Sequence, residues 1–396
     1  MPRAVWLLVI GMAVNVTGAS FLWPLNSIYI HEHLGKSLTI AGVVLMLNSG
    51  ASVIGNLLGG RLFDKFGGYR SILLGIVITL LALIGLSCWN GWPAYVIFLT
   101  IIGLGTGIVF PSMYAMAGTV WKEGGRRAFN AIYVASNLGV AIGSSLGGIV
   151  AAISFQWIFI ANAILYAIFL IIAFFGYKGI NRPEAVNVAK EQTASKVRKV
   201  NAQLTALFIL CIGYMLCWIG YSQWQATVAP YTQELGISLR EYSYLWTING
   251  ALIVLGQPFL NRLVISFAKT VKSQIVIGTI IFAVAFLVAS LAQSFAGFAI
   301  GMVIMTIGEM LVWPAVPTIA DKLAPVGKEG FYQGIANSAA TGGRMLGPII
   351  GGMLVDFYNM QTLFIVMIGL FLLSLITTFS FDRKITNKNN ISMKAS

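Results

Sequence analysis

Residues 39–89 read TIAGVVLMLNSGASVIGNLLGGRLFDKFGGYRSILLGIVITLLALIGLSCW. Two apolar runs, 39–60 and 70–89, flank a short segment that is rich in glycine and charge. Each run has about the 20 residues that a helix needs to cross the hydrocarbon core of a bilayer. This stretch therefore predicts two membrane-spanning helices joined by a tight turn at the membrane surface.

The same pattern recurs along the chain, which predicts an all-α membrane protein of twelve transmembrane helices. Of the 396 residues, 58% are hydrophobic and only 9% are charged. A soluble domain carries about 25% charged residues, so this chain has too little polar surface to cover itself in water. The expected spans are 4–27, 39–60, 70–89, 93–118, 128–151, 154–176, 204–229, 242–265, 273–292, 296–320, 330–354 and 359–381.

An internal repeat divides these spans into two pseudo-symmetric six-helix bundles. At an offset of about two hundred residues, Asn48 matches Asn249 and Gly55 matches Gly256. Further matches pair Gly105 with Gly308, Phe110-Pro111 with Trp313-Pro314, and Gly139, Gly143 and Gly147 with Gly343, Gly347 and Gly351. We expect an N-terminal bundle in 1–176, a cytoplasmic linker in 177–203, and a C-terminal bundle with a short cytoplasmic tail in 204–396. Parallel repeats of this kind are a known transporter plan, with the substrate site between them near the bilayer midplane.

The distribution of lysine and arginine predicts the orientation of the chain in a bacterial cytoplasmic membrane. One alternating set of loops holds Arg3, Arg61, Lys65, Arg70, Lys122, Arg126, Arg127, Lys178, Arg182, Lys269, Lys272, Lys322 and Lys328, among others. The other set holds only Lys36 and Arg240. Because cytoplasmic loops carry the excess of positive charge, we expect both termini and the linker to be cytoplasmic. The net charge of +13 lies between spans rather than on one face, which argues against nucleic-acid binding.

The turn at residues 59–70 is the most specific segment. Gly60 and Gly67 allow a tight turn. Asp64 can accept hydrogen bonds from the N-terminus of a helix, where the macrodipole favours an anion, and the span that starts near Gly330 on the same side is its expected partner. The predicted conformational latch consists of Gly60, Asp64, Lys65, Gly67 and Arg70. An ordinary positively charged turn is the alternative.

This segment closely resembles the cytoplasmic signature of the major facilitator superfamily, and the resemblance extends over all twelve spans, the linker and the repeat. It implies that the segment latches the outward-open state. The sequence departs from the family pattern at Gly68, where a polar or basic residue is frequent. The second copy has Ile265 where Asp64 stands, so its latch should be weaker.

Two glycine-rich runs resemble the antiporter motif of the drug:proton antiporter branch of that family. Residues 139–148 read GVAIGSSLGG, with Ser144 in place of the usual proline, and residues 343–352 read GRMLGPIIGG. The motif residues are Gly139, Gly143, Gly147, Gly343, Gly347 and Pro348. The duplication favours export, while close helix packing through small residues is the alternative. The branch often carries an arginine in the fourth span, and 93–118 has none.

Two charged residues within spans are candidates for proton coupling. Glu309 lies in the expected span 296–320 and Arg344 in 330–354. A charge at that depth costs several kcal/mol unless it is paired or hydrated, so it is by default a functional hypothesis. We predict that Glu309 takes up the proton, in competition with a cationic substrate. Arg344 would stabilise the charged form in one state and release it in another. A permanent ion pair between the two helices is the alternative.

The predicted substrate cavity combines aromatic rings with amides. Trp218, Tyr221 and Trp224 recur at every third residue and share one helical face, and aromatic faces bind lipophilic cations. Amides within spans should face inward, because an unpaired amide in lipid is costly. The cavity residues are Asn15, Tyr114, Asn137, Trp218, Tyr221, Trp246, Asn249, Trp313 and Asn337. Near the outer surface, Trp23 and Trp224 are expected to be interfacial.

No pattern in the sequence indicates an enzyme, a cofactor or a metal site. His31, Glu32 and His33 are adjacent rather than one helical turn apart, and they predict an outer loop. We therefore expect a monomeric transporter that exports small amphipathic or drug-like compounds in exchange for protons by alternating access. Two alternatives stay open. One is an exporter of a sugar or other polar metabolite, and the other is a membrane sensor or assembly partner that does not transport.

Overall fold

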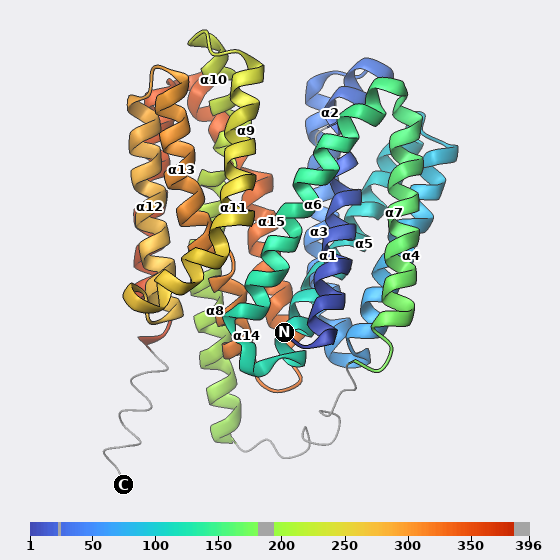
Figure 1. The fold of residues 1–396 in the computed structure, drawn as a ribbon, viewed down its shortest axis with the longest axis vertical. Helices are drawn as coiled ribbons and strands as arrows, with labels where there is room; N and C mark the ends of the chain where they lie inside the picture. Colours follow the sequence, from blue (N-terminus) through green and yellow to red (C-terminus); the bar gives the residue numbers. More distant parts are fainter. Residues whose placement is uncertain (23–24, 181–193, 384–396) are drawn as a thin grey trace. The chain divides into compact units, whose positions relative to one another are not determined.

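The computed structural model describes residues 1–22, 25–180 and 194–383. Trp23, residues 181–193 of the expected linker and the end of the tail lie outside these ranges. Within them the chain forms helices and turns and no strand (Figure 1). The twelve helices of at least 18 residues are α1 (Arg3–Leu22), α3 (Leu38–Phe66), α4 (Gly68–Cys88), α5 (Ala94–Val120), α6 (Arg126–Ile153), α7 (Phe155–Gly176), α8 (Ala194–Tyr221), α11 (Leu239–Phe267), α12 (Val271–Leu291), α13 (Phe295–Val312), α15 (Glu329–Phe357) and α16 (Met360–Ser380).

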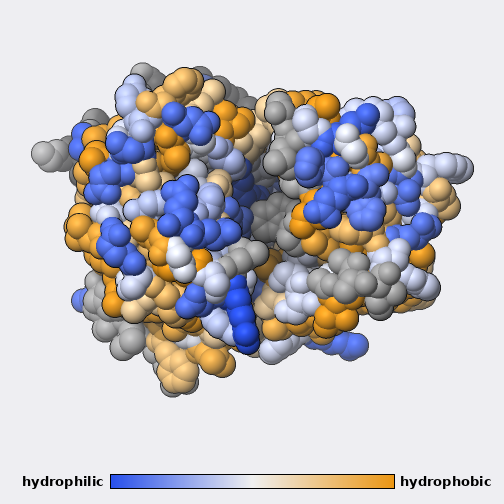
Figure 2. Space-filling view, turned by 90° about the horizontal axis from the view of Figure 1, so that it is seen from above, coloured by the Kyte–Doolittle hydropathy of each residue, from blue (hydrophilic) through white to orange (hydrophobic). Residues whose placement is uncertain are grey.

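Most of these helices are long and apolar enough to cross a membrane. Ten helical stretches among the described residues meet that standard by length and composition. The helices α11 and α15 have 29 residues each, and they complete the predicted twelve although they are more polar. Figure 2 shows hydrophilic residues gathered on the face at the helix ends and hydrophobic residues at its margin. The all-α, twelve-helix prediction is confirmed.

The chain divides into two compact units. The first comprises Met1–Val186 with Val326–Ser338, and the second comprises Asn187–Pro325 with Ala339–Ser396. The first turns of α15 thus belong to the first unit. The helix α8 begins at Ala194, before the expected start of its span at 204, because the residues after 193 continue the helix without a proline or glycine.

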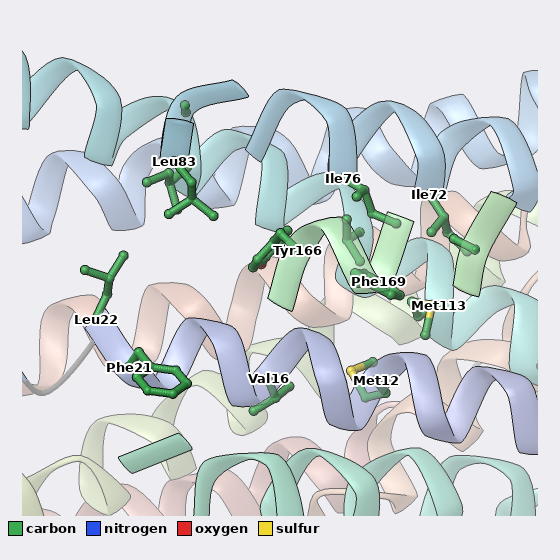
Figure 3. Close-up of a cluster of buried hydrophobic side chains, with 14 of the residues drawn as sticks. Met12, Val16, Phe21, Leu22, Ile72, Ile76, Leu83, Met113, Tyr166 and Phe169 are labelled. Carbon is green, nitrogen blue, oxygen red and sulfur yellow. The ribbon is translucent and has the colours of Figure 1, made fainter. Parts of the chain in front are cut away.

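Equivalent helix pairs pack in the two units, as the repeat predicts. The pairs α3–α5, α4–α5, α4–α7 and α1–α7 of the first unit correspond to α11–α13, α12–α13, α12–α16 and α8–α16 of the second. The core of the first unit lies where α1, α4, α5 and α7 meet. Figure 3 shows Met12, Ile76, Met113 and Phe169 converging there, each fully buried.

Two expected spans are interrupted in the second unit. The expected span 204–229 consists of α8, the short α9 (Gln223–Ala226) and the start of α10 (Val228–Glu234). The expected span 296–320 consists of α13 and most of α14 (Ala315–Leu323). The short helix α2 (Asn26–Ile28), a π-helical turn (Tyr29–His33) and a 3₁₀ turn (Lys122–Gly124) complete the described helices.

Candidate functional site

Glu309 lies near the end of α13, and its side chain is almost completely buried, with 3% of its surface exposed. Its carboxylate oxygen Oε2 accepts two hydrogen bonds, from the hydroxyl of Tyr221 at 3.0 Å and from Nδ2 of Asn249 at 2.8 Å. Tyr221 ends α8 and Asn249 belongs to α11. Three helices of the second unit therefore meet at one carboxylate.

Asn249 is held in place by a second bond. Its Nδ2 also donates to Oγ1 of Thr306, at 2.9 Å, one turn before Glu309 on α13. Thr306 donates its own hydroxyl proton to the carbonyl of Met302 at 2.7 Å, which leaves its oxygen to accept from Asn249. Both protons of the Asn249 amide are thus donated. Since Glu309 and Thr306 both act as acceptors here, the side-chain atom that faces them must be the nitrogen.

An aromatic cluster lies beside this carboxylate. The indole rings of Trp218 and Trp313 are stacked, with centroids 4.3 Å apart and an interplanar angle of 4°. The ring of Tyr221 stands edge-on to both, at 5.3 and 5.5 Å. Tyr214 stands edge-on to Trp313 at 5.5 Å. The hydroxyl of Tyr221 therefore connects the aromatic cluster to Glu309.

Arg344 of α15 lies on the same cluster. Its guanidinium carbon is 4.7 Å from the centroid of Trp218, a cation–π distance. Its Nη2 atom donates to Oγ1 of Thr341 at 3.4 Å. The indole Nε1 atoms of Trp218 and Trp313 are buried and have no hydrogen-bond partner among the described residues. The cluster therefore offers a cation and two indole donors next to an acid.

Pro314 interrupts the span directly after this cluster. A proline has no N–H and cannot bond the carbonyl four residues earlier, which here belongs to Met310. The Nε2 atom of Gln257, from α11, donates to that carbonyl at 3.3 Å. Trp313 still donates its N–H to the carbonyl of Glu309 at 3.0 Å. The break between α13 and α14 is therefore stabilised from outside the helix and begins one turn after the carboxylate.

The other predicted cavity residues are placed differently. Trp246 lies near Tyr221, with ring centroids 6.3 Å apart, and donates to the hydroxyl of Tyr242 at 2.9 Å. In the first unit, Asn15 is fully buried and accepts a bond from Tyr166 at 2.8 Å.

Three further candidates in the first unit each contact a neighbour of their own. Tyr114 stacks on Phe129 at 6.2 Å. Asn137 and Asn337 each donate to the carbonyl one turn earlier in their own helix, at 2.9 Å. Of the nine predicted cavity residues, the structure thus brings Trp218, Tyr221, Trp246, Asn249 and Trp313 together around Glu309.

Trp224 corrects one expectation from the sequence. The helix α8 ends at Tyr221, so the three-residue spacing does not continue on one helical face, and Trp224 lies in α9. Its side chain is 1% exposed and packs against Phe286 rather than at an interface. The third aromatic residue on the face of Trp218 and Tyr221 is Tyr214 instead, and the three positions follow i, i+4 and i+7 spacing. A helical period of 3.6 residues could have identified it from the sequence.

Asp64 caps the first turn of α15 in the first unit. Its two carboxylate oxygens accept from the backbone N–H groups of Gly330, at 2.7 Å, and Phe331, at 2.9 Å. A side chain at Gly60 would collide with the carbonyl of Gly330, so the glycine permits the close approach. Gly67 has φ +83° and ends α3. This geometry is that of an anion at a helix N-terminus.

Two basic residues of this segment, Lys65 and Arg61, lie over aromatic rings. Lys65 lies 5.0 Å from the ring centroid of Phe66, and Arg61 lies 5.5 Å from that of Phe331. Arg61 was not among the predicted latch residues, although its ring contact joins α3 to α15. Arg70 is exposed near the start of α4.

The glycines of both antiporter-like runs lie at helix contacts. Side chains at Gly139 and Gly143 would collide with α1, at Ala13 and Thr17, and one at Gly147 would touch Phe21. A side chain at Gly343 would collide with Trp218 of α8, and one at Gly347 with Ser222, directly after that helix. Pro348 lies inside α15, and its lack of an N–H withdraws the usual partner from the carbonyl of Arg344. These runs therefore bring α6 close to α1 and α15 close to α8.

No group of three or more metal-binding side chains occurs among the residues that the structure describes. His31 Nδ1 lies 2.8 Å from the carbonyl of Lys36. The ring of His33 stacks on Tyr29, with centroids 5.4 Å apart, and is tilted against Phe155 at 4.4 Å. The two histidines thus have separate partners in an exposed turn.

Comparisons with known proteins agree with this architecture. The family model described as Major Facilitator Superfamily matches residues 8–229 and 210–395. The "Uncharacterized MFS-type transporter YttB" of Bacillus subtilis is 59% identical over 396 residues, which cover 100% of this chain and 99% of that protein. The multidrug resistance protein MdtH of Aeromonas hydrophila is 21% identical over 360 residues, 90% of this chain and 88% of the relative. The crystal structure of the human organic anion transporter MFSD10 matches with a TM-score of 0.72 at 15% identity, over 96% of this chain and 100% of that one.

Twelve long helices in two repeated units, matched over their whole length by transport proteins, define a multi-pass membrane transporter rather than an enzyme. The chain belongs to the Major Facilitator Superfamily. Within it, the chain resembles the drug:proton antiporter branch. Such a transporter moves a small-molecule substrate and resides in a lipid bilayer.

Proposed function

We propose that this protein exports small amphipathic compounds in exchange for protons, by alternating access, and that Glu309 carries the proton. The observation that supports this most directly is the buried Glu309 carboxylate, held by the neutral donors Tyr221 and Asn249. A carboxylate at mid-span is costly, and either a proton or a cationic substrate relieves that cost. The two therefore compete, which is what exchange requires.

Protonation of Glu309 also changes the contacts between helices. Hydrogen bonds to an ionised carboxylate are roughly twice as strong as those to a neutral group. When Glu309 takes up a proton, the bonds from Tyr221 on α8 and Asn249 on α11 weaken together. The break at Pro314 lies one turn away, so the end of α13 can tilt with little loss of backbone bonding. Proton uptake is in this way linked to a change in helix packing.

The aromatic cluster supports an amphipathic substrate. Trp218, Trp313, Tyr221 and Tyr214 offer ring faces and edges that bind apolar, planar groups by contact area. Arg344 lies over Trp218 at the same place where a cationic substrate would gain cation–π attraction. We propose that Arg344, which lies on Trp218 in this structure, changes its distance from Glu309 during the cycle and thereby favours the charged carboxylate in one state only. The multidrug name of a relative agrees with such a substrate class.

The proposal includes the remaining expectations from the sequence. The bundles 1–176 and 204–396, joined by the linker 177–203, alternate access in the cytoplasmic membrane as a monomer, with both termini cytoplasmic. The contact of Asp64 with the first turn of α15 breaks and re-forms in each cycle. The antiporter-like glycines of α6 and α15 provide close contacts along which these helices shift.

The test is transport by the full chain in proteoliposomes, with and without an imposed pH gradient. A panel contains lipophilic cations such as tetraphenylphosphonium and uncharged sugars. We expect gradient-driven flux of the cations, and loss of that flux in Glu309→Gln. The control is Glu234→Gln, which removes an exposed carboxylate from α10 of the same unit.

Each rival function has its own outcome in this assay. Gradient-driven flux of sugars but not cations would identify an exporter of polar metabolites. The absence of flux for every compound, with a folded protein, would favour a sensor or assembly partner. Full gradient-driven export by Glu309→Gln would remove Glu309 from the mechanism.

A further inference from the structure

A groove of about 640 Å³ opens in the first unit and includes none of the residues of the proposed proton site. It lies between the first two turns of α1 and the last turns of α7. Its walls include Leu7, Ile171, Phe175 and Ile180, and Arg3 is its one charged lining residue. The volume lies within the roughly 300–1,000 Å³ typical of small-molecule sites. The groove is thus open to the surface and mostly apolar, with a single cation in its lining.

A hydrogen bond beneath the groove keeps the two helix ends together. The hydroxyl of Tyr177, directly after α7, donates to the carbonyl of Leu7 on α1 at 3.2 Å. Tyr177 is fully buried, and a side chain at Gly11 would collide with its hydroxyl. Gly11 therefore makes room for this tie between α1 and α7. Leu7, whose carbonyl accepts this bond, lines the groove, and the lining residues Ile171 and Phe175 are 58% and 75% exposed.

The charge around the groove is positive. Neither α1 nor α7 contains an acidic residue, and exposed Lys178 follows α7. Arg3 has no ion pair within the described part of the chain. Arg3 also starts α1, where the free backbone N–H groups and the macrodipole favour an anion. An apolar molecule with an anionic end therefore complements the groove along its length.

The position of the groove along the helices selects the occupant. Arg3–Leu22 and Phe155–Gly176 are membrane-spanning candidates, and the groove lies at the ends of both, on the side where the sequence predicts the cytoplasm. Lipid headgroups lie at that depth, with acyl chains directly below them. Basic pockets between transmembrane helices at this level bind anionic headgroups.

We propose that this groove is a binding site for one anionic phospholipid. The phosphate bonds the Arg3 guanidinium, whose planar fork matches phosphate oxygens. An acyl chain lies along Leu7, Ile171 and Phe175, covering apolar surface at the outside of the α1–α7 contact. The lipid would thereby fasten these two helix ends to the membrane surface.

The experiment measures lipid binding to the purified full chain by native mass spectrometry, with phosphatidylglycerol and phosphatidylcholine offered at equal concentration. We expect the wild type to retain phosphatidylglycerol about tenfold better, the effect of one charge-assisted contact. Arg3→Gln should lower phosphatidylglycerol to the phosphatidylcholine level. Gly176→Leu, which places a side chain in the groove, should lower both lipids.

Two controls decide between specific and general attraction. Arg127→Gln removes an exposed arginine from α6, outside the groove, and should leave the lipid preference intact. Equal retention of the two lipids by the wild type, or an equal loss in Arg127→Gln, would overturn the proposal. Competition by inorganic phosphate at matched concentration would show a simple anion site and overturn it as well. Circular dichroism checks that each variant is folded.

Discussion

The α3–α5 contact of the first unit and the equivalent α11–α13 contact of the second differ in what lies between the helices. In the first, side chains added at Gly55, Gly103 or Gly107 would collide with the opposite backbone. In the second, Gly256 has nothing nearer than the end of the Met310 side chain, 3.7 Å away. Backbone contact leaves no space for side chains, whereas the looser contact holds Asn249, Thr306 and Glu309, which are joined by hydrogen bonds.

The repeat shows how this difference arose residue by residue. At the offset that pairs Gly105 with Gly308, Glu309 corresponds to Thr106. The hydroxyl of Thr106 bonds its own helix, at the carbonyl of Ile102, at 2.9 Å. The carboxylate of Glu309 instead needs donors from two other helices. In this duplicated scaffold, the contact in one half is closely packed and the equivalent contact in the other holds a charge.

The largest effect, on stability, is expected when the α3–α5 contact receives the residue found at the equivalent position of the α11–α13 contact. Gly103 corresponds to Thr306, and a side chain at Gly103 would collide with the carbonyl of Asn48. Gly103→Thr should therefore destabilise the first unit by about 3 kcal/mol or more, seen as a low yield of folded protein and a lower Tm. Thr306→Ser, which keeps the hydroxyl, is the control and should be mild. A Gly103→Thr variant as stable as the wild type would show that α3 and α5 can move apart to accommodate a side chain.

The next effect concerns Asp64, whose counterpart in the second half is Ile265. Asp64→Asn retains one acceptor oxygen and removes the anion from the α15 N-terminus, an interaction of about 1–2 kcal/mol. We expect roughly a tenfold fall in transport rate, measured in proteoliposomes. Glu123→Gln removes an exposed carboxylate elsewhere and should transport normally. Equal rates for Asp64→Asn and the wild type would refute the latch.

A smaller effect should follow from copying an aromatic position of one half into the other. A side chain at Gly139 would meet Val16 as one at the matching Gly343 would meet Trp218, so these two positions correspond. Trp218→Val removes both the stack on Trp313 and the ring under Arg344. The half-saturating concentration of an aromatic substrate should rise about fivefold, since such a pair contributes about 1 kcal/mol. Phe259→Val, at an exposed position of the same unit, should leave it unchanged. A similar rise in both variants would point to a general loss of packing.

The smallest effect, on the Tm, is expected at the start of α11, which differs from the start of α3 in the hydrogen bonds of one side chain. Ser37 and Ser238 both bond the backbone N–H three residues later, of Ile40 and Glu241. Only Glu241 returns a bond, accepting from the hydroxyl and N–H of Ser238 at 2.7 and 2.9 Å. These bonds hold the pKa of Glu241 below its usual value.

Because the pKa of Glu241 is lower in the folded protein than in the unfolded chain, its bonds stabilise α11 at pH values above the unfolded pKa, which is about 4.3. That stabilisation disappears as the pH falls through the folded value. The Tm of the wild type should exceed that of Glu241→Gln by about 1 °C or less at pH 6, and the difference should vanish in acid. A difference that is constant with pH would assign the effect to something other than ionisation.

Much of the fold follows from local sequence. Apolar runs of about 20 residues predict spans because backbone polar groups in lipid must bond within the helix. The matched glycines and prolines reveal the repeat. The partner of Asp64 near Gly330 could also be anticipated, because an acid beside a helix start has few other uses. The break at α13–α14 could have been anticipated from Pro314, which cannot continue a helical hydrogen-bond ladder. The interruption at α8–α9 could not, since hydropathy is insensitive to a local break without a proline.

The arrangement around Glu309 depended on tertiary packing. The sequence indicates a buried acid in span ten and suitable amides and rings elsewhere. It does not show that Asn249 bonds that acid whereas Asn15 bonds Tyr166, because both asparagines occupy apolar helices with similar neighbours. Thr306 and Gln257 were missed for the same reason, since their roles depend on which helix faces them.

By itself the sequence determined that this chain is a duplicated helical membrane transporter with one acidic side chain and one basic side chain deep in its second half. Hydrophobic length, charge placement and internal similarity suffice for that, because each acts within a single helix or loop. Only the tertiary structure decided that Glu309 shares its bonds with Tyr221 and Asn249 and that Arg344 lies on Trp218. Such contacts join residues far apart in the chain, and their geometry depends on how closely each pair of helices can approach.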